Sequence, residues 1–412
     1  MTHRVVVTGM GVATPLGCTV QGFRDALLAG RSGVGPLTVF DPGGLATRIA
    51  AEVKDPDALG LHTDRKASLA RWAAARAWED ATARGSEPLG DRALAGASFG
   101  IGLELFTMGD LARSRAPGFV PPDTTRDKLR FLQVPSDLVL HVLCKTYGLR
   151  APPLLHVSAC AAGTDALGAA WRMIATGRRR WMLAGGSDSM INPLGVAGFC
   201  TLNAMSTRND DPPRASRPFD RTRDGFVLGE GAAALVLERR EDALARGAAV
   251  YAELAGYGNS LDAHAITEPE PEGRGALLAM RKALRAAGLS PDDIDCVNAH
   301  GTGTPKNDPA ETLALKALLG ARAPRVPVCA TKSMIGHLIS AAGAVEAVAA
   351  IACMNKGMVH PTINLREADP QCDLDYVPDG ARAHPQRAVL SSSYGFGGQN
   401  AAVVLLHPER GP

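Results

Sequence analysis

One cysteine and two histidines of this sequence have side chains and surroundings suited to catalysis. Cys160 follows a short apolar run, 153–157, and precedes a stretch with helical periodicity from about residue 165 to 176. This pattern predicts a thiol on a tight strand-to-helix turn, at the positive end of a helix, where the thiol pKa falls and a nucleophile forms. A lone cysteine in an alanine-rich segment is more often plain core, so the prediction depends on the residues downstream.

The two histidines lie in the second half of the chain. His300 lies in NAHGTGTP, which fits a surface turn as well as a site loop and lacks the Gly-Lys-Ser/Thr of a phosphate-binding loop. His337 ends KSMIGH and precedes an apolar run, so we expect it to be partly buried. Glu346 is a lone acid in AAGAVEAVAAIA and needs a partner, for which Lys332 is the nearest candidate. The glycines around Phe396 in YGFGGQN predict a loop whose amides point at a ligand.

The elements that must position these residues alternate between strand and helix. Predicted strands cover 4–8, 95–101, 181–184 and 232–238, then 250–256, 294–298, 326–330, 390–394 and 401–406. Predicted helices cover 23–29, 68–83, 137–147, 275–288, 309–319 and 335–355, and the glycines at 9–11, 185–186 and 257–258 are predicted as turns. The alternation indicates an α/β fold with buried sheets.

Two segments are alike in their order of elements, which indicates an internal duplication. Residues 154–177 and 327–357 both combine a strand, a turn and a helix of small residues. We therefore expect two similar halves, residues 1–249 with the cysteine and residues 250–412 with the two histidines.

The composition excludes several classes of protein. The 412 residues are 46% hydrophobic and 21% charged, and the net charge of +2 does not indicate a nucleic-acid partner. Eight cysteines without a CxxC pair argue against a zinc ribbon or redox dithiol and favour a reduced, cytoplasmic protein. The start does not resemble a signal peptide, and no run of about 18 apolar residues predicts a membrane span.

Four sequence elements, in this order, resemble the β-ketoacyl-ACP synthases, condensing enzymes with a Cys-His-His site. They are SACAAG around Cys160, HGTGTP, KSMIGH with AAGAVE, and GFGGQN. STRNDDPPRASRPFDRTRDGFVLGEGA and HPTINL also match, and the likeness runs from residue 5 to about residue 406. The resemblance implies a thiolase-like fold in which two similar halves form a five-layered αβαβα arrangement.

The resemblance also implies an elongating acyltransferase that performs a decarboxylative Claisen condensation. Cys160 would accept an acyl group as a thioester, and the amides of Cys160 and Phe396 would form an oxyanion hole. After malonyl loses CO2, His300 and His337 would donate hydrogen bonds to the enolate oxygen. We expect no metal and no organic cofactor, since the histidines replace a Lewis acid.

Further roles are implied by the resemblance for residues around this set. Lys332 and Glu346 would position His337 as an ion pair, and Phe396 would swing as a gate upon acylation. The predicted substrate-binding residues, which would contact the phosphopantetheine arm, are Thr302, Thr304, Gly397 and Gly398. The predicted docking residues for an acidic acyl carrier protein are Arg65, Lys66 and Arg208.

Departures from the family pattern leave the pathway open. Ala161, Tyr394 and Gln399 stand where many relatives have other residues, which weakens an assignment to fatty-acid synthesis and admits a type II polyketide pathway. The partner in a dimer is equally open: a second copy, or a Cys-lacking chain-length factor. Acyl-chain length is expected to depend on both subunits and on the loops at Leu103–Phe106 and 107–135.

Four other readings compete with this one. A thiolase needs a second cysteine in the C-terminal glycine loop, and residues 394–400 contain none. A Cys-His-Asn chain-starting enzyme lacks a histidine at 337, and a non-catalytic chain-length partner lacks the nucleophile. A zinc protein using Cys160, His300 and His337 needs a fourth ligand or an open site.

Overall fold

A single sheet of ten strands organises the chain. The structure is a computed structural model that describes residues 3–62, 64–83, 89–102, 117–118 and 137–409. The strand order is β10-β9-β13-β14-β8-β1-β7-β6-β4-β5. The first-half strands are β1 Val5–Ala13, β4 Gly96–Ile101, β5 Leu154–His156, β6 Trp181–Asp188 and β7 Gly231–Arg239. The second-half strands are β8 Ala252–Leu261, β9 Cys296–Asn298, β10 Val328–Cys329, β13 Ala388–Gly395 and β14 Gln399–Leu406.

The two halves of the sheet have the same topology. In each, three antiparallel strands (β1-β7-β6 or β8-β14-β13) continue into two parallel ones (β4-β5 or β9-β10). The halves meet where β1 pairs with β8 at only two positions, Val6 with Glu253 and Val7 with Ala252. Every strand on one side of this contact precedes residue 250, and we therefore propose 249/250 as the boundary between the halves.

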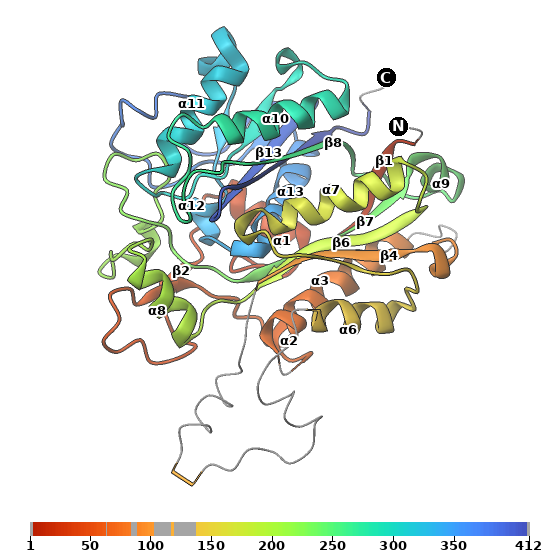
Figure 1. Ribbon diagram of the computed structural model, residues 1–412, viewed down its shortest axis with the longest axis horizontal. Coiled ribbons are helices and arrows are strands. Elements are labelled where there is room, and N and C mark those ends of the chain that lie inside the picture. The colour runs from red at the N-terminus through yellow and green to blue at the C-terminus, as the bar shows by residue number, and fades with distance from the viewer. Residues whose placement is uncertain (1–2, 63, 84–88, 103–116, 119–136, 410–412) are drawn as a thin grey trace.

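Helices cover both faces of each half-sheet, which gives five layers (Figure 1). The central layer holds α7 Ala162–Ala175 and α13 Ala342–Met354, and all 13 residues of α13 are buried. A helix that is apolar on every side is stable only between other elements, which explains this placement. The outer layers are α3 Arg65–Thr82 with α6 Leu138–Tyr147, and α10 Arg274–Ala287 with α11 Asn307–Leu319.

The remaining elements are short. The helices are α1 Val20–Leu28, α2 Pro56–Leu59, α8 Pro193–Thr201, α9 Arg240–Ala245 and α12 Lys332–Ile335. Two small antiparallel pairs are β2 Val34–Pro36 with β3 Ile49–Ala51, and β11 Met358–Val359 with β12 Arg382–Ala383. Within the described ranges, no helix is both long and apolar enough to cross a membrane.

The glycine pairs predicted as turns lie inside strands instead. A Cβ on Gly9 or Gly11 of β1 would lie 2.2 or 2.0 Å from a backbone oxygen of α3. A Cβ on Gly256 or Gly258 of β8 would likewise lie 2.3 Å from a backbone oxygen of α10. Glycine is required here because it lets a helix backbone approach the strand closely, not because the chain turns. The pair at 185–186 likewise lies within β6.

The apolar helix predicted over 335–355 is also interrupted. The chain leaves α12 at Gly336, whose φ is +68°. Ile339, with a φ of +44°, begins a short 3₁₀ turn, Ile339–Ala341. Only from Ala342 does α13 run on. The break places His337 in extended backbone rather than in a helix, where its side chain faces the cavity described below.

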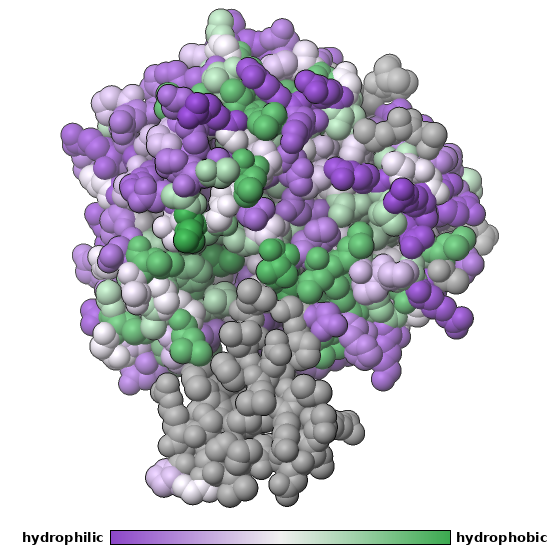
Figure 2. All heavy atoms as spheres, in the orientation of Figure 1, coloured by the Kyte–Doolittle hydropathy of each residue, from purple (hydrophilic) through white to green (hydrophobic). Residues whose placement is uncertain are grey.

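Apolar side chains gather on one part of the surface. Figure 2 shows hydrophobic residues across the middle of the molecule, over the region of β4 and β6, whereas the part over α10 and α11 is mostly hydrophilic. β5 is the last strand on that side of the sheet, so one of its edges has no partner strand in the described chain. Val157, directly after β5, is 50% exposed.

Candidate active site

Cys160 lies on a strained turn between β5 and α7. The turn is a 3₁₀ segment, Ala159–Ala161, and Ala159 has a φ of +49°, a left-handed conformation that costs a non-glycine residue about 1 kcal/mol or more. The same geometry recurs in the second half, where Ile339 precedes α13 at the equivalent place. Cys160 is 6% exposed. The turn therefore presents the thiol at the start of α7, as the sequence pattern indicated.

The pKa of the Cys160 thiol moves in the direction opposite to our expectation. Burial raises it to about 11, although the charge of Lys332 and the backbone N–H groups of Phe396 and Cys160 lower it. Desolvation of the thiolate therefore outweighs the helix terminus, and the resting thiol is protonated at neutral pH. The two N–H groups nevertheless point toward the thiol sulfur, because each lowers the pKa of Cys160.

His300 is held by a buried carboxylate that the sequence analysis did not identify. Glu311 of α11 accepts the N–H of His300 at 2.7 Å and that of Gly301 at 2.8 Å. It is 1% exposed, and burial raises its pKa to about 7 against the effect of these hydrogen bonds. The loop after β9 thus receives its position from a side chain one turn into the following helix.

A second missed acid fixes the rest of the loop. Asp308 accepts the N–H of Phe219 at 2.7 Å and that of Gly303 at 3.2 Å. The guanidinium of Arg223 lies 3.9 Å away and is itself paired with Asp369. The available signal was two acids three residues apart at the start of a helix that directly follows HGTGTP.

His337 is clamped through its backbone and its ring. Its N–H donates to the carbonyl of Val227 at 2.7 Å, and its carbonyl accepts from Gly229 at 2.9 Å. The N–H of Ile339 donates to its Nδ1 at 3.2 Å. Because Nδ1 is the acceptor, the neutral ring carries its proton on Nε2.

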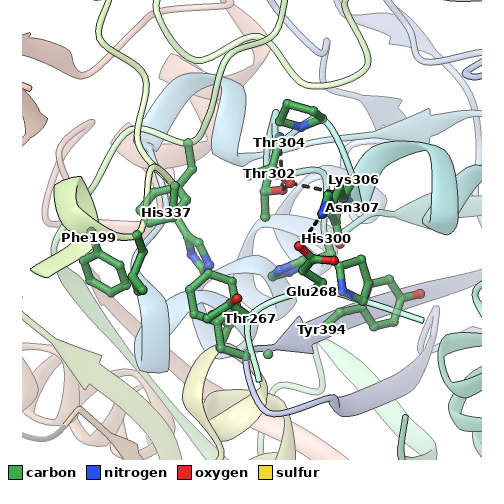
Figure 3. Close-up of a pocket in the computed structure, with 18 of the residues that line it drawn as sticks. Phe199, Thr267, Glu268, His300, Thr302, Thr304, Lys306, Asn307, His337 and Tyr394 are labelled. Carbon is green, nitrogen blue, oxygen red and sulfur yellow. Dashed lines mark hydrogen bonds and ion pairs between the residues drawn. The ribbon is translucent and has the colours of Figure 1, made fainter. Parts of the chain in front are cut away.

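The three predicted catalytic residues converge in one buried cluster. The thiol of Cys160 and one ring nitrogen of each histidine lie within 4.8 Å of one another. The imidazole rings of His300 and His337 meet edge to face, with an interplanar angle of 82° and centroids 5.3 Å apart (Figure 3). Burial and the charge of Lys332 hold both imidazole pKa values well below their ordinary range, so both rings are neutral at pH 7. Neutral rings donate hydrogen bonds without adding charge.

Lys332 and Glu346 form the ion pair that the sequence suggested. The ammonium of Lys332 contacts Oε1 of Glu346, and the two side chains are 1% and 0% exposed. A pair buried this deeply needs both members, since a single buried charge is costly. The Lys332 charge reaches the whole site, because it lowers the pKa of Cys160, His300 and His337.

The cluster opens into a pocket of about 290 Å³. Thr302 and Thr304 line one wall, and their hydroxyl groups are 2.9 Å apart. Other lining residues include Phe199, Leu202, Phe226, Thr267, Glu268, Lys306, Asn307, Ile339, Tyr394, Gly395 and Phe396. The lining thus combines apolar side chains with polar groups that include the two threonine hydroxyls.

Two predicted substrate-binding glycines do not line the pocket. The N–H of Gly397 donates to the carbonyl of Ile266 at 2.6 Å, and that of Gly398 to the carbonyl of Gly395 at 3.1 Å. Their amides are therefore used within the protein and do not point at a ligand. The pocket is lined instead by Gly395 and Phe396 of the same hairpin.

The predicted docking residues differ in exposure. Lys66 is only 3% exposed, and the guanidinium of Arg65 is paired with the buried Glu230, so neither provides a free surface cation. Both belong to the first turn of α3, which faces inward here. Arg208 is partly exposed, and its docking role stays a prediction. The loops at Leu103–Phe106 and 107–135, expected to shape the acyl pocket, lie outside the described residues, except for 117–118.

Comparison with known proteins gives matches over almost the whole chain. Two family models match: β-ketoacyl synthase, N-terminal domain, at residues 2–243, and β-ketoacyl synthase, C-terminal domain, at residues 251–366. A 3-oxoacyl-[acyl-carrier-protein] synthase 2 of Synechocystis sp. is 42% identical over 98% of this chain and 97% of its own. A putative polyketide β-ketoacyl synthase 1 of Streptomyces halstedii is 43% identical, and the match covers 100% of this chain and 99% of the relative. A solved type II PKS ketosynthase in complex with its acyl-carrier protein has a TM-score of 0.87 and 33% identity, covering 99% of this chain and 100% of its own.

Proposed function

The chain belongs to the β-ketoacyl synthase family, whose members are condensing enzymes of the acyltransferase type, and we propose that Cys160, His300 and His337 catalyse its condensation. The substrates are an acyl chain and a malonyl group, each carried on the phosphopantetheine of an acyl carrier protein, and the product is two carbons longer. The observation that carries the proposal is the convergence of one thiol and two neutral imidazoles within 4.8 Å.

The first step transfers the acyl group to Cys160. A bond forms between Sγ and the acyl carbonyl carbon, the bond to the pantetheine sulfur breaks, and the thiol proton ends on that sulfur. The N–H groups of Cys160 and Phe396 stabilise the oxyanion of the tetrahedral intermediate. Because the thiol pKa is about 11, these donors and the Lys332 charge favour the small thiolate fraction that reacts.

The second step forms the new carbon–carbon bond. The bond between the carboxylate carbon and the α-carbon of the malonyl group breaks, CO2 leaves, and the electron pair of that bond forms an enolate. The enolate oxygen accepts hydrogen bonds from the N–H groups of His300 and His337. The enolate carbon attacks the thioester carbonyl, the bond to Sγ breaks, and Cys160 takes up a proton. The Nε2–H tautomer of His337, fixed by Ile339, supports this donor role.

The proposal extends to partners and assembly. The hydroxyl groups of Thr302 and Thr304 bind the phosphopantetheine arm, Phe396 moves as a gate, and Arg208 docks the acidic carrier protein. We propose a two-fold homodimer formed through the free edge of β5 and the apolar surface beside it, since exposed edges invite pairing. Free thiols at all eight cysteines support a cytoplasmic location.

The test is the intact mass of the full chain after incubation with acyl carrier proteins bearing different acyl groups. We expect a gain of one acyl group in the wild type and in the control Cys353→Ala, and none in Cys160→Ala. The preferred acyl group distinguishes fatty-acid from polyketide substrates, and size-exclusion chromatography with light scattering measures the oligomer. Acylation that persists in Cys160→Ala, or no acylation from any donor, would overturn the proposal.

Cys160, His300 and His337 also have a geometry that fits a zinc site, so metal dependence must be tested. We propose catalysis without a metal, because the neutral imidazoles and backbone amides supply the hydrogen bonds that the enolate and oxyanion need. Acylation and condensation should therefore survive dialysis against EDTA. If EDTA abolished both activities and added zinc restored them, the result would favour a zinc site at Cys160, His300 and His337 instead.

A further inference from the structure

An ion pair lies on the wall of the catalytic pocket. Lys306 and Glu268 both line the pocket that contains Cys160, and the Lys306 ammonium donates to Oε1 of Glu268 (Figure 3). Their side chains are 62% and 48% exposed, so the pair lies where the pocket meets solvent. An exposed pair of this kind contributes little to stability. Its position, rather than its strength, suggests a role.

Lys306 also marks the positive end of a helix. It is the N-terminal flanking residue of α11, which has 13 residues; its own side chain does not cap the helix, and the Thr304 hydroxyl accepts the N–H of Asn307 at 3.3 Å. Positive charge at a helix N-terminus attracts anions. The anion seated beside Lys306 in this structure is the carboxylate of Glu268, whose pKa is lowered chiefly by its hydrogen bond to Lys306.

Two neighbouring carboxylates face cations of their own. Asp308, in the first turn of α11, is buried and faces Arg223, while Glu270 is paired with Arg274. His264 adds a weaker attraction on Glu268.

The segment that carries Glu268 is attached to the loop that carries Phe396. The carbonyl of Ile266 accepts the N–H of Gly397 at 2.6 Å, and the N–H of Asp262 donates to the carbonyl of Gly398 at 2.9 Å. The segment 262–268 therefore runs from the hairpin between β13 and β14 to the N-terminus of α11. Glu268 makes the contact between this segment and Lys306. Separation of this one exposed pair frees Lys306.

We propose that Lys306, with the N-terminal turn of α11, binds the phosphate of the phosphopantetheine arm, and that Glu268 occupies this position until the arm enters. The proposal rests on the proposed function and names the charged group that recognises its substrate. The neutral remainder of the arm then lies along Thr302 and Thr304, which line the same wall. The phosphate and the Glu268 carboxylate compete for the Lys306 ammonium. Removing the charge of Lys306 should therefore weaken phosphate binding, whereas removing the charge of Glu268 should strengthen it.

The test uses two probes that differ only in the phosphate, S-methylpantetheine and its 4′-phosphate. Neither is an acyl donor, so each reports occupancy of the pocket alone. We measure the concentration of each that halves the rate at which iodoacetamide alkylates Cys160, by peptide mass spectrometry at pH 8. The ratio of the two concentrations gives the preference for phosphate.

The expected results are specific for each variant. The wild type should prefer the phosphate about three- to tenfold, as for one charge-assisted contact at an exposed site. Lys306→Gln should remove this preference, and Glu268→Gln should increase it about two- to fivefold. Lys316→Gln is the matched control, because Lys316 lies on the same helix in an exposed pair with Asp373 outside the pocket.

Two outcomes would overturn the proposal. One is equal protection by the two probes in the wild type, including none from either. The other is a phosphate preference that Lys306→Gln leaves unchanged or that Lys316→Gln reduces equally. Because the probes carry no acyl group, these results are independent of the acylation test, and failure of acylation at Cys160 would refute the proposed function separately.

Discussion

Glu311→Gln is the substitution that most directly tests how the His300 loop is held. The carboxylate accepts two backbone N–H groups, whereas glutamine offers one oxygen acceptor and one NH2 donor. One buried N–H then faces another donor, at a cost of about 1.5–3 kcal/mol for a lost charge-assisted hydrogen bond. If the loop relaxes by that amount, decarboxylation slows by about 10- to 100-fold at a factor of ten per 1.4 kcal/mol.

The effect must also depend on pH, because protonated Glu311 has the same donor and acceptor pattern as glutamine. The pKa of Glu311 is about 7, so the wild type holds the carboxylate at pH 8.5 and the acid at pH 6. His300 and His337 titrate well below this range and Cys160 near 11, so none of them obscures it. Glu311→Gln should therefore decarboxylate more slowly than the wild type at pH 8.5 and at the same rate near pH 6.

The assay is the release of CO2 from malonyl carrier protein between pH 6 and 8.5, beside acylation of Cys160 measured by intact mass. Acylation should change less than decarboxylation, since it uses the amides of Cys160 and Phe396. Ser392→Ala, which removes a 3.5 Å contact to Glu311 and leaves both of its backbone hydrogen bonds in place, is the control with a small expected effect. Equal rates for wild type and Glu311→Gln at pH 8.5, or a deficit of the same size at pH 6, would refute the reasoning.

Three further predictions concern charge and burial. The pKa of Glu311 is raised, so its contribution to folding stability is full below its ordinary pKa of 4.5 and is lost as pH rises through about 7. The urea concentration at the midpoint of unfolding should therefore decrease over this pH range in the wild type. Glu311→Gln should reduce this dependence of the midpoint on pH. Alkylation of Cys160 by iodoacetamide should increase about tenfold per pH unit from 6 to 9 without a plateau, whereas a plateau below pH 9 would show a thiolate of much lower pKa than 11. Lys332→Met should slow that alkylation and destabilise the chain by about 3–5 kcal/mol in chemical denaturation, and Lys332→Met with Glu346→Met should recover most of the stability; no recovery would contradict the ion-pair argument.

The residues of the proposed catalytic set could be selected from sequence because their selection depends on local pattern. A cysteine between a strand and a helix of small residues, and two histidines in glycine-rich loops, are each encoded within about ten neighbouring residues. The repeated order of strand, turn and helix likewise predicted two halves, and the ten-stranded sheet has the same topology on both sides. Periodicity also placed α3, α7, α10 and α11 to within a few residues.

Other features depended on what distant segments bring together. The residues at 9–11 and 257–258 were predicted as turns, because nothing nearby in sequence reveals the helix that packs on their glycines. Lys66 looked like a surface cation, but the fold around α3 buries it. Glu311 and Asp308 were not singled out from sequence, because their role depends on the loop amides of residues 300–303, which the fold places against them.

The pKa of Cys160 illustrates the physical reason for this division. The sequence determined a helix N-terminus beside the thiol, which favours the thiolate, and this local effect is present. The tertiary structure determined the burial of the thiol, and desolvation raises its pKa to about 11. Residue type and spacing set the local conformation and the available groups, whereas solvation and charge depend on atoms from strands and helices far away in the chain, so only the folded arrangement decides which effect prevails.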